Sequence, residues 1–253
     1  MDPMQNIQKQ LRILRAWAVV STVLFAALIL VAADSESSKS KFDEIDTQRI
    51  NILGEDGKLR LTISNNEKSP GPIIGGKAMK SRDGKRGAGL IFFNDNGDEC
   101  GGMTWHGQKK DGMVNANSGL MFDQYDSDQT VGIQYSQQGD NRSSGLHVWE
   151  RSLKPMGEFA QQVNDAKLMK DGPEKTEALK KVRERALADG LAGVQRVFVG
   201  RTPQNDAVVL LMDTKGKARI RLAVDSANAA SLQFLDENGR TVLTLPNSPP
   251  APK

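Results

Sequence analysis

The side chains that could do chemistry gather in two acidic stretches and one basic stretch of this 253-residue chain. Oxygen ligands for a metal ion occur in NDNGDE (residues 94–99) and FDQYDSDQ (residues 122–129), and the weak candidates among them are Asp95, Asp98, Asp123, Asp126 and Asp128. A helix-flanked calcium loop needs Asp-x-Asp-x-Asp-Gly and a glutamate at its twelfth position, and neither stretch has that spacing. We therefore interpret both as acidic hairpin turns and expect no bound metal.

The basic stretch GPIIGGKAMKSRDGKRGAG (residues 71–89) carries five weak anion-binding candidates, which are Lys77, Lys80, Arg82, Lys85 and Arg86. A phosphate-binding loop would place Lys-Ser or Lys-Thr after its last glycine and would open a helix. Here GGKAM lacks the hydroxyl, and the next element reads as a strand. We interpret the stretch as a flexible loop, with contact to an anionic lipid or glycan as the alternative.

No catalytic or cofactor-binding residue can be assigned. The chain has two histidines, His106 and His147, and no HExxH or GxSxG element. One cysteine, Cys100, rules out an intrachain disulfide and a cysteine-based zinc cage. Acid–base pairs of Asp and Glu stay open, because their separation in space cannot be read from the sequence.

The elements that would position these side chains are short β-hairpins. RINILGEDGKLRLTI, VVLLMDTKGKARIRLAV and SLQFLDENGRTVLTL each alternate apolar and polar residues on both sides of a turn that ends in glycine. GLIFFNDNGDECGGMTW, GLMFDQYDSDQTVGIQY and GIQYSQQGDNRSSGLHV are looser versions. Period-two alternation around such turns predicts antiparallel hairpins with one apolar face. We expect a mainly β fold in which hairpin repeats form a meander, barrel, sandwich or prism, or pair with copies on other chains.

A helical insert interrupts the hairpins. EFAQQVNDAKLMK and GPEKTEALKKVRERALADG have apolar residues on one helical face, and the second has Pro173 near its start and Gly190 just past its end. An α-helical hairpin is predicted at about residues 156–189. The predicted organisation is a cytoplasmic N-terminus (1–15), a transmembrane helix (16–33), a polar tether (34–41), a β-hairpin domain (42–150), the helical insert (151–193), C-terminal hairpins (194–246) and a disordered tail (247–253).

The membrane segment AWAVVSTVLFAALILVAA (residues 16–33) carries no charge and is long enough to cross a bilayer. Three bases, Lys9, Arg12 and Arg15, precede it, and acids and serines follow it. The positive-inside rule then predicts a single-pass inner-membrane protein with a cytoplasmic N-terminus and residues 34–253 outside the cytoplasm. The alternative is export followed by cleavage of a signal peptide near Ala33.

Three blocks of the chain resemble a family. KFDEIDTQRINILGEDGKLRLTISN (residues 41–65), GLIFFNDNGDECGG (residues 89–102) and LMFDQYDSDQ (residues 120–129) resemble a set of uncharacterised bacterial membrane-anchored proteins, in which an N-terminal hydrophobic segment precedes the same blocks. The resemblance covers roughly residues 41–150 and implies no activity, ligand or catalytic residue.

From these observations we expect an extracytoplasmic β-repeat protein with a structural or interaction role and no enzymatic activity, because no catalytic motif assigns one. Its expected partners are the membrane, copies of itself and an envelope component, and not nucleic acid, because the net charge of +3 gives no broad positive field. The alternatives are an envelope hydrolase that acts on glycan or lipid through Asp and Glu, and a module that binds an anionic polymer through residues 71–89.

In the hairpin of residues 89–106, Gly101-Gly102 predicts a bulge or a close approach of two backbones.

Overall fold

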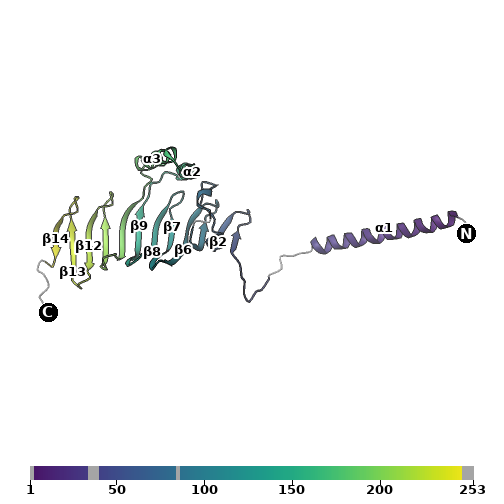
Figure 1. Cartoon of the computed structure of the whole chain (residues 1–253), viewed down its shortest axis with the longest axis horizontal. Helices are drawn as coiled ribbons and strands as arrows, with labels where there is room; N and C mark the ends of the chain where they lie inside the picture. Colours follow the sequence, from purple (N-terminus) through teal and green to yellow (C-terminus); the bar gives the residue numbers. More distant parts are fainter. Residues whose placement is uncertain (1–2, 34–39, 84–85, 247–253) are drawn as a thin grey trace. The chain divides into compact units, whose positions relative to one another are not determined.

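A computed structural model describes residues 3–33, 40–83 and 86–246 of the chain. It divides into two units, of which the first ends at Asp46 and the second begins at Thr47. The first unit contains one helix, α1 (Pro3–Ala33), and the second contains every strand and the other helices (Figure 1). The two units are treated separately below.

Helix α1 is continuous over 31 residues, so it begins well before the predicted membrane segment. Its stretch Met4–Ala27 is long and apolar enough to cross a membrane, with a mean hydropathy of 1.3. The hydroxyls of Ser21 and Thr22 donate hydrogen bonds to carbonyls one turn earlier, at Trp17 and Ala18. They therefore add no unpaired polar group to a surface that would face lipid.

The second unit is built on one antiparallel sheet of 12 strands, which confirms the prediction of a mainly β fold made from hairpins. The order of the strands in the sheet is their order along the chain, apart from β3 and β4, which form a small sheet of their own. The sheet is an open meander, and the barrel that the sequence left open does not form. Its strands are β1 (Arg49–Leu53), β2 (Leu59–Ser64), β5 (Ala88–Phe93), β6 (Glu99–Lys110), β7 (Met113–Asp123), β8 (Gln129–Gln138), β9 (Asn141–Glu150), β10 (Val194–Arg201), β11 (Ala207–Met212), β12 (Ala218–Val224), β13 (Ala230–Leu235) and β14 (Thr241–Leu245).

The hairpin turns repeat one hydrogen-bond pattern. In the β11–β12 turn, the N–H of Asp213 donates to the carbonyl of Lys217, and the N–H of Gly216 donates to the carbonyl of Asp213. The same pair of bonds closes the turns that begin at Gly54, Asn94, Thr202, Asp225 and Asp236. The fourth residue of each has a positive φ, and it is a glycine in four turns and an asparagine at Asn205 and Asn228. Glycine and asparagine tolerate this conformation best, so the turn chemistry sets the register of each hairpin.

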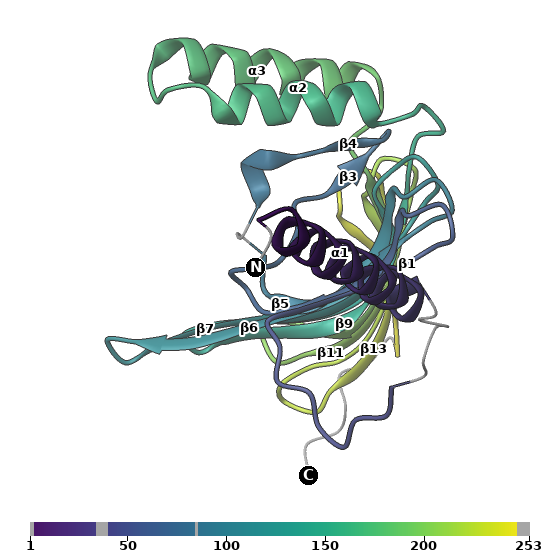
Figure 2. The ribbon, with the colours of Figure 1, turned by 90° about the vertical axis from the view of Figure 1, so that its right-hand side faces the viewer.

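The basic stretch between β2 and β5 is folded, which corrects the expectation of a flexible loop. It forms β3 (Ile73–Ile74), β4 (Lys77–Ala78) and a 3₁₀ turn, η1 (Lys80–Arg82). Met79 and Ser81 are buried, at 6% exposure each. Figure 2 shows β3–β4 between the bent sheet and the helices, on one side of the sheet.

Two antiparallel helices, α2 (Gly157–Leu168) and α3 (Pro173–Ala188), lie beyond η1 and confirm the predicted helical hairpin. Pro173 occupies the first turn of α3, and Gly190, with φ of 67°, follows its last residues. The N–H groups of Gly190 and Leu191 donate to the carbonyls of Leu187 and Ala186, which is a Schellman motif. Asn164 of α2 accepts a hydrogen bond from the N–H of Ser81 at 3.0 Å, so α2 holds η1 in place.

Candidate functional site

The two faces of the 12-stranded sheet differ in chemistry. One face carries two rows of side chains that run across all its strands, and each row takes one residue from every strand. The first row is Ile50, Ile63, Leu90, Met103, Leu120, Ile133, Leu146, Val199, Val209, Leu222, Leu232 and Leu245. The second is Ile52, Leu61, Phe92, Gly101, Phe122, Val131, Val148, Val197, Leu211, Ile220, Phe234 and Leu243. We call these two rows together the apolar stripe.

The apolar stripe is open to solvent in the single chain. Every side chain in it is half-buried or exposed, and Ile133 and Leu222 are 58% and 51% exposed. Its one interruption, Gly101, lies between Phe92 and Phe122, whose rings stack over this position with centroids 6.4 Å apart. An apolar surface therefore runs without a gap from β1 to β14.

The opposite face contains a polar cleft of about 500 Å³ over β5 to β8. Its floor comes from residues that alternate with the apolar stripe, including Ile91, Gly102 and Met121. Its polar lining is Asn66, Arg82, Arg86, Glu99, Thr104, His106, Asn117, Asp123 and Gln129. We refer to this site as the polar cleft.

Four charged side chains form the inner end of the polar cleft. Arg86 donates to Glu99 with 2.6 Å between Nη2 and Oε1, and both side chains are only 11% exposed. Arg82, from η1, and Asp123, from the end of β7, line the cleft beside this pair. Desolvation, and then the positive charge of Arg86, lower the pKa of Arg82.

Asp123 is the most perturbed acid of the cluster. Burial raises its pKa to about 7, and the negative charges of Glu99 and Asp128 add to that effect. Arg86 and Arg151 act in the opposite direction but do not compensate. A carboxyl with a pKa near neutrality exchanges its proton under physiological conditions, which is a property of binding and catalytic sites.

Three buried polar atoms of this cluster have no hydrogen-bond partner within the part of the chain that the structure describes. They are Nη1 of Arg86, Oε2 of Glu99 and Oδ1 of Asp123. Buried polar groups are almost always paired in folded proteins, so three unpaired atoms in one cleft mark a place where a ligand can bind. The first is a donor, and the other two are acceptors when ionised.

A smaller cavity, of about 200 Å³, lies between the same charged cluster and α2. Met156, Phe159, Ala160 and Val163 give it an apolar wall, and Arg82, Arg86, Glu99 and Asp123 are shared with the polar cleft. Helix α2 thus closes the back of the charged cluster.

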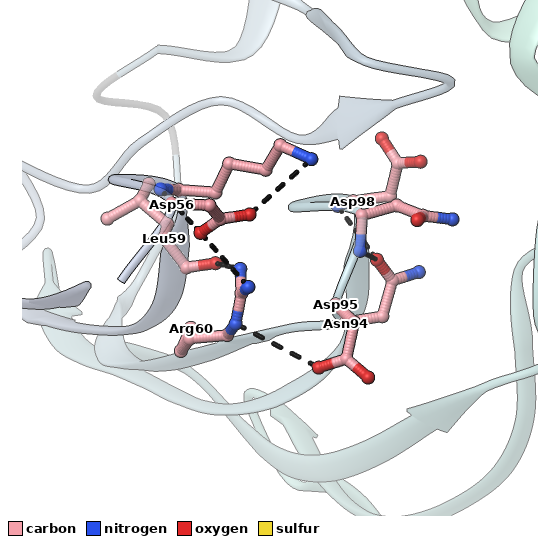
Figure 3. Close-up of polar contacts among 8 residues, drawn as sticks. Asp56, Leu59, Arg60, Asn94, Asp95 and Asp98 are labelled. Atoms are coloured by element: carbon pink, nitrogen blue, oxygen red, sulfur yellow. Dashed lines mark hydrogen bonds and ion pairs between the residues drawn. The ribbon is translucent and has the colours of Figure 1, made fainter. Parts of the chain in front are cut away.

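The structure separates the five acidic candidates. Asp95 is fully exposed and lies 3.9 Å from Arg60, which also bonds Asp56 in the neighbouring turn (Figure 3). Asp98 accepts a hydrogen bond from the N–H of Gly76. Asp128 lies 3.7 Å from Arg151. Only Asp123 lines the polar cleft.

Asp126 stands at a positive φ of 54° in the β7–β8 turn, and its carbonyl accepts a hydrogen bond from Met156. Among the described residues, no three His, Cys, Asp or Glu side chains are grouped so that they could hold a metal ion.

The basic candidates are also divided. Lys77, Lys80 and Arg82 are exposed and Arg86 is half-buried, and of these four only Arg82 and Arg86 line the polar cleft. Lys85 lies outside the described residues. The two arginines therefore belong to a mixed-charge cluster with Glu99 and Asp123.

The histidines and the cysteine are divided between the two halves of the sheet. His106 lines the polar cleft, whereas His147 stacks on Trp149 at 5.2 Å between ring centroids, and burial lowers its pKa. Cys100 is half-buried, and its pKa is raised by burial and then by the charges of Asp123 and Glu99. A thiol with a raised pKa is a poor nucleophile.

The prediction for Gly101-Gly102 is confirmed. The register between β5 and β6 shifts at Phe92–Phe93, opposite the start of β6, as a bulge requires. A Cβ on Gly102 would lie 2.6 Å from the carbonyl oxygen of Leu90.

A comparison of the sequence with protein-family models and with curated proteins finds no match.

Proposed function

We propose that this protein is a membrane-anchored, extracytoplasmic interaction module, without enzymatic activity, that assembles with copies of itself through the apolar stripe. The observation that carries the proposal is the unbroken register of apolar side chains across all 12 strands. A β-sheet with one apolar face is stable in water when that face is buried against another layer. Within one chain, nothing among the described residues supplies that layer.

The size of the apolar stripe fits an interface between proteins. Twelve strands about 4.8 Å apart and two rows about 7 Å apart make a surface of roughly 50 by 14 Å, or about 700 Å². The largest apolar patch on an ordinary monomer is about 300–600 Å². A stable interface buries about 800 Å² on each partner. The stripe alone therefore approaches the area that a stable dimer needs.

The chemistry of the apolar stripe favours a second copy as its occupant. Apart from Gly101, the rows consist of Val, Ile, Leu, Met and Phe, and they contain no charged residue, which is the composition of the inner layer of a β-sandwich. A second copy presents the same surface, so a two-fold arrangement buries both stripes at once. Anchors in one membrane would also keep the copies close together.

The proposed location rests on the N-terminal segment. Helix α1 has the length and composition of a membrane span, the bases Lys9, Arg12 and Arg15 lie in its first half, and acids follow it in the sequence. By the positive-inside rule, the sheet would stand outside the cytoplasm.

Crosslinking tests directly whether a second copy of the chain covers the apolar stripe. A photoreactive phenylalanine analogue at Ile133, in the full chain in its native membrane, should link two chains and double the apparent mass of 27.6 kDa. Ile133→Glu and Leu222→Glu should abolish assembly of the detergent-solubilised chain, because each buries an unpaired charge in the apolar stripe, at the middle of the sheet and near its β14 edge, respectively.

Ser136→Glu is the matched control, because Ser136 lies on the same strand as Ile133, is exposed, and points to the opposite face. It should assemble like the wild type. A monomer in both detergent and membrane would overturn the proposal. So would crosslinks from position 133 to lipid or to another protein only.

The two alternatives receive less support. A hydrolase needs two available carboxyls, but Glu99 is already paired with Arg86. A module for anionic polymers needs its bases on one surface, but Arg86 faces Glu99, and Arg82 is desolvated in the same cluster.

A further inference from the structure

We propose that the polar cleft binds a neutral, hydroxyl-rich ligand, namely a sugar residue of an envelope glycan. The inference starts from the three unpaired buried atoms, which are Nη1 of Arg86, Oε2 of Glu99 and Oδ1 of Asp123. A ligand that binds here must accept a hydrogen bond from the arginine and donate one to each carboxylate.

The mixture of charges disfavours a ligand that carries charge of one sign only. A phosphate or carboxylate would accept from Arg82 and Arg86, but it would lie against Glu99 and Asp123. An ammonium group would donate to both acids, but it would lie against both arginines. A hydroxyl group accepts and donates at once and carries no charge, so two or three hydroxyls on one ring can satisfy all three atoms.

The rest of the polar cleft fits the same class of ligand. Its volume of about 500 Å³ lies within the range of about 300–1,000 Å³ for small-molecule sites. Asn66, Thr104, Asn117 and Gln129 add neutral groups that can both donate and accept. Gly102, which also lines the cleft, is buried and has no side chain that could project into it.

The cleft is independent of the apolar stripe, because the two lie on opposite faces of the same strands. Sugar binding therefore goes beyond self-assembly, and the two can be tested separately. Ile133→Glu, which should abolish assembly, should leave sugar binding unchanged.

Binding is measured on the full chain in a detergent without a sugar headgroup. The probes are methyl glycosides of glucose, galactose, mannose and N-acetylglucosamine, followed by saturation-transfer NMR and calorimetry. At least one should bind, and Asp123→Asn should weaken its affinity at least tenfold, because an amide can present its nitrogen where the sugar donates. Thr104→Ala, which removes only a hydroxyl from the wall, should weaken it about threefold.

Asp126→Asn is the matched control, since Asp126 is a neighbouring acid that does not line the cleft. It should bind as the wild type does. Inorganic phosphate and methylammonium serve as ionic probes. Binding of either ion without any of the glycosides would overturn the inference, as would the absence of binding by every probe. Equal loss of affinity in Asp123→Asn and Asp126→Asn would overturn the assignment of the site.

Discussion

Asp123 has a pKa of about 7, well above the ordinary value for a carboxyl, because burial and two neighbouring acids disfavour its charge. The charged groups that act on it are Glu99 and Asp128, which raise the pKa, and Arg86 and Arg151, which lower it. In the unfolded chain the same carboxyl titrates near pH 4. Folding therefore binds a proton between about pH 4 and pH 7, and stability is lost as the pH rises through this window.

Asp123→Asn should remove this dependence. We expect its free energy of unfolding, relative to wild type, to rise by about 1–3 kcal/mol between pH 4 and pH 8. Urea unfolding of both proteins at pH 4 and pH 8 measures this difference in the free energy of unfolding. If the difference between variant and wild type is the same at both pH values, the prediction is contradicted. The same substitution should weaken sugar binding, so stability and affinity should change in opposite directions, which a purely structural role does not explain.

At the scale of residues, the sequence shows which residue types could form a site, but not which of them lie close together in space. Asp123 could be read as an acidic candidate, but its partner Glu99 lies 24 positions earlier and stood out only as one acid in a turn. Arg82 and Arg86 looked like part of a basic loop. What joins them is the pairing of β6 with β7 and the contact of η1 with α2, and single-sequence periodicity reports neither.

At the scale of elements, Gly102 shows how closely two strands approach under the cleft. Gly102→Ala would place a Cβ 2.6 Å from the carbonyl oxygen of Leu90 and 3.1 Å from Cδ1 of Ile91. Both atoms belong to the paired strand β5, so relief requires the backbone to move. We expect a loss of about 1–3 kcal/mol in the free energy of unfolding.

Gly107→Ala is the control in the same strand, because a Cβ there would make only an ordinary contact of 3.7 Å with Ala116. Its free energy of unfolding should stay within about 0.5 kcal/mol of wild type. Denaturant unfolding of the wild type, Gly102→Ala and Gly107→Ala measures the three free energies of unfolding. Equal stability of the two alanine variants would show that β5 yields to the added methyl group.

Elements were predictable where local chemistry defines them. Alternation and turn glycines predict the hairpins, and Pro173 and Gly190 mark the ends of α3. Turns closed by Asn205 and Asn228 carry the weaker asparagine signal. The segment of β3, β4 and η1 looked flexible because its order comes from contacts with α2 rather than from its own sequence.

For the whole molecule, the proposed anchor makes a separate prediction. The full chain should remain with the membrane in alkaline carbonate, with its first residues intact by mass spectrometry. Leu24→Arg, near the middle of the predicted membrane segment (residues 16–33), should release a substantial part of the protein, because a central arginine costs about 2.5–3.5 kcal/mol. Leu24→Ile is the control and should stay in the pellet.

Added protease should digest the sheet in spheroplasts, from which the outer layers have been removed, but not in intact cells. A mature protein that begins at Asp34 would instead establish the cleaved form. Digestion only after lysis would place the sheet in the cytoplasm. Each outcome concerns location alone and leaves the apolar stripe and the polar cleft as they are.

The self-assembly that we propose could be read from the sequence only as one option among several. Alternation shows that each hairpin has an apolar face, but not whether neighbouring hairpins turn that face to the same side. The register of the paired strands shows that they do, because Ile50 in β1 and Leu245 in β14 lie at the two ends of one row. A lone chain that leaves these two apolar rows open to solvent has an incomplete layer on that face of the sheet.

The meander order has a consequence for how such a chain is made. If the sheet is exported as we propose, it leaves the translocation channel unfolded, and β1 emerges before β14 because β1 follows the anchor in the sequence. Because every strand of the large sheet pairs with its neighbours in chain order, each hairpin can add to the edge that has already emerged. Low sequence separation between paired strands also favours rapid folding. Synthesis, and the export that we propose, can thus build the sheet from β1 onwards before the C-terminus has been made.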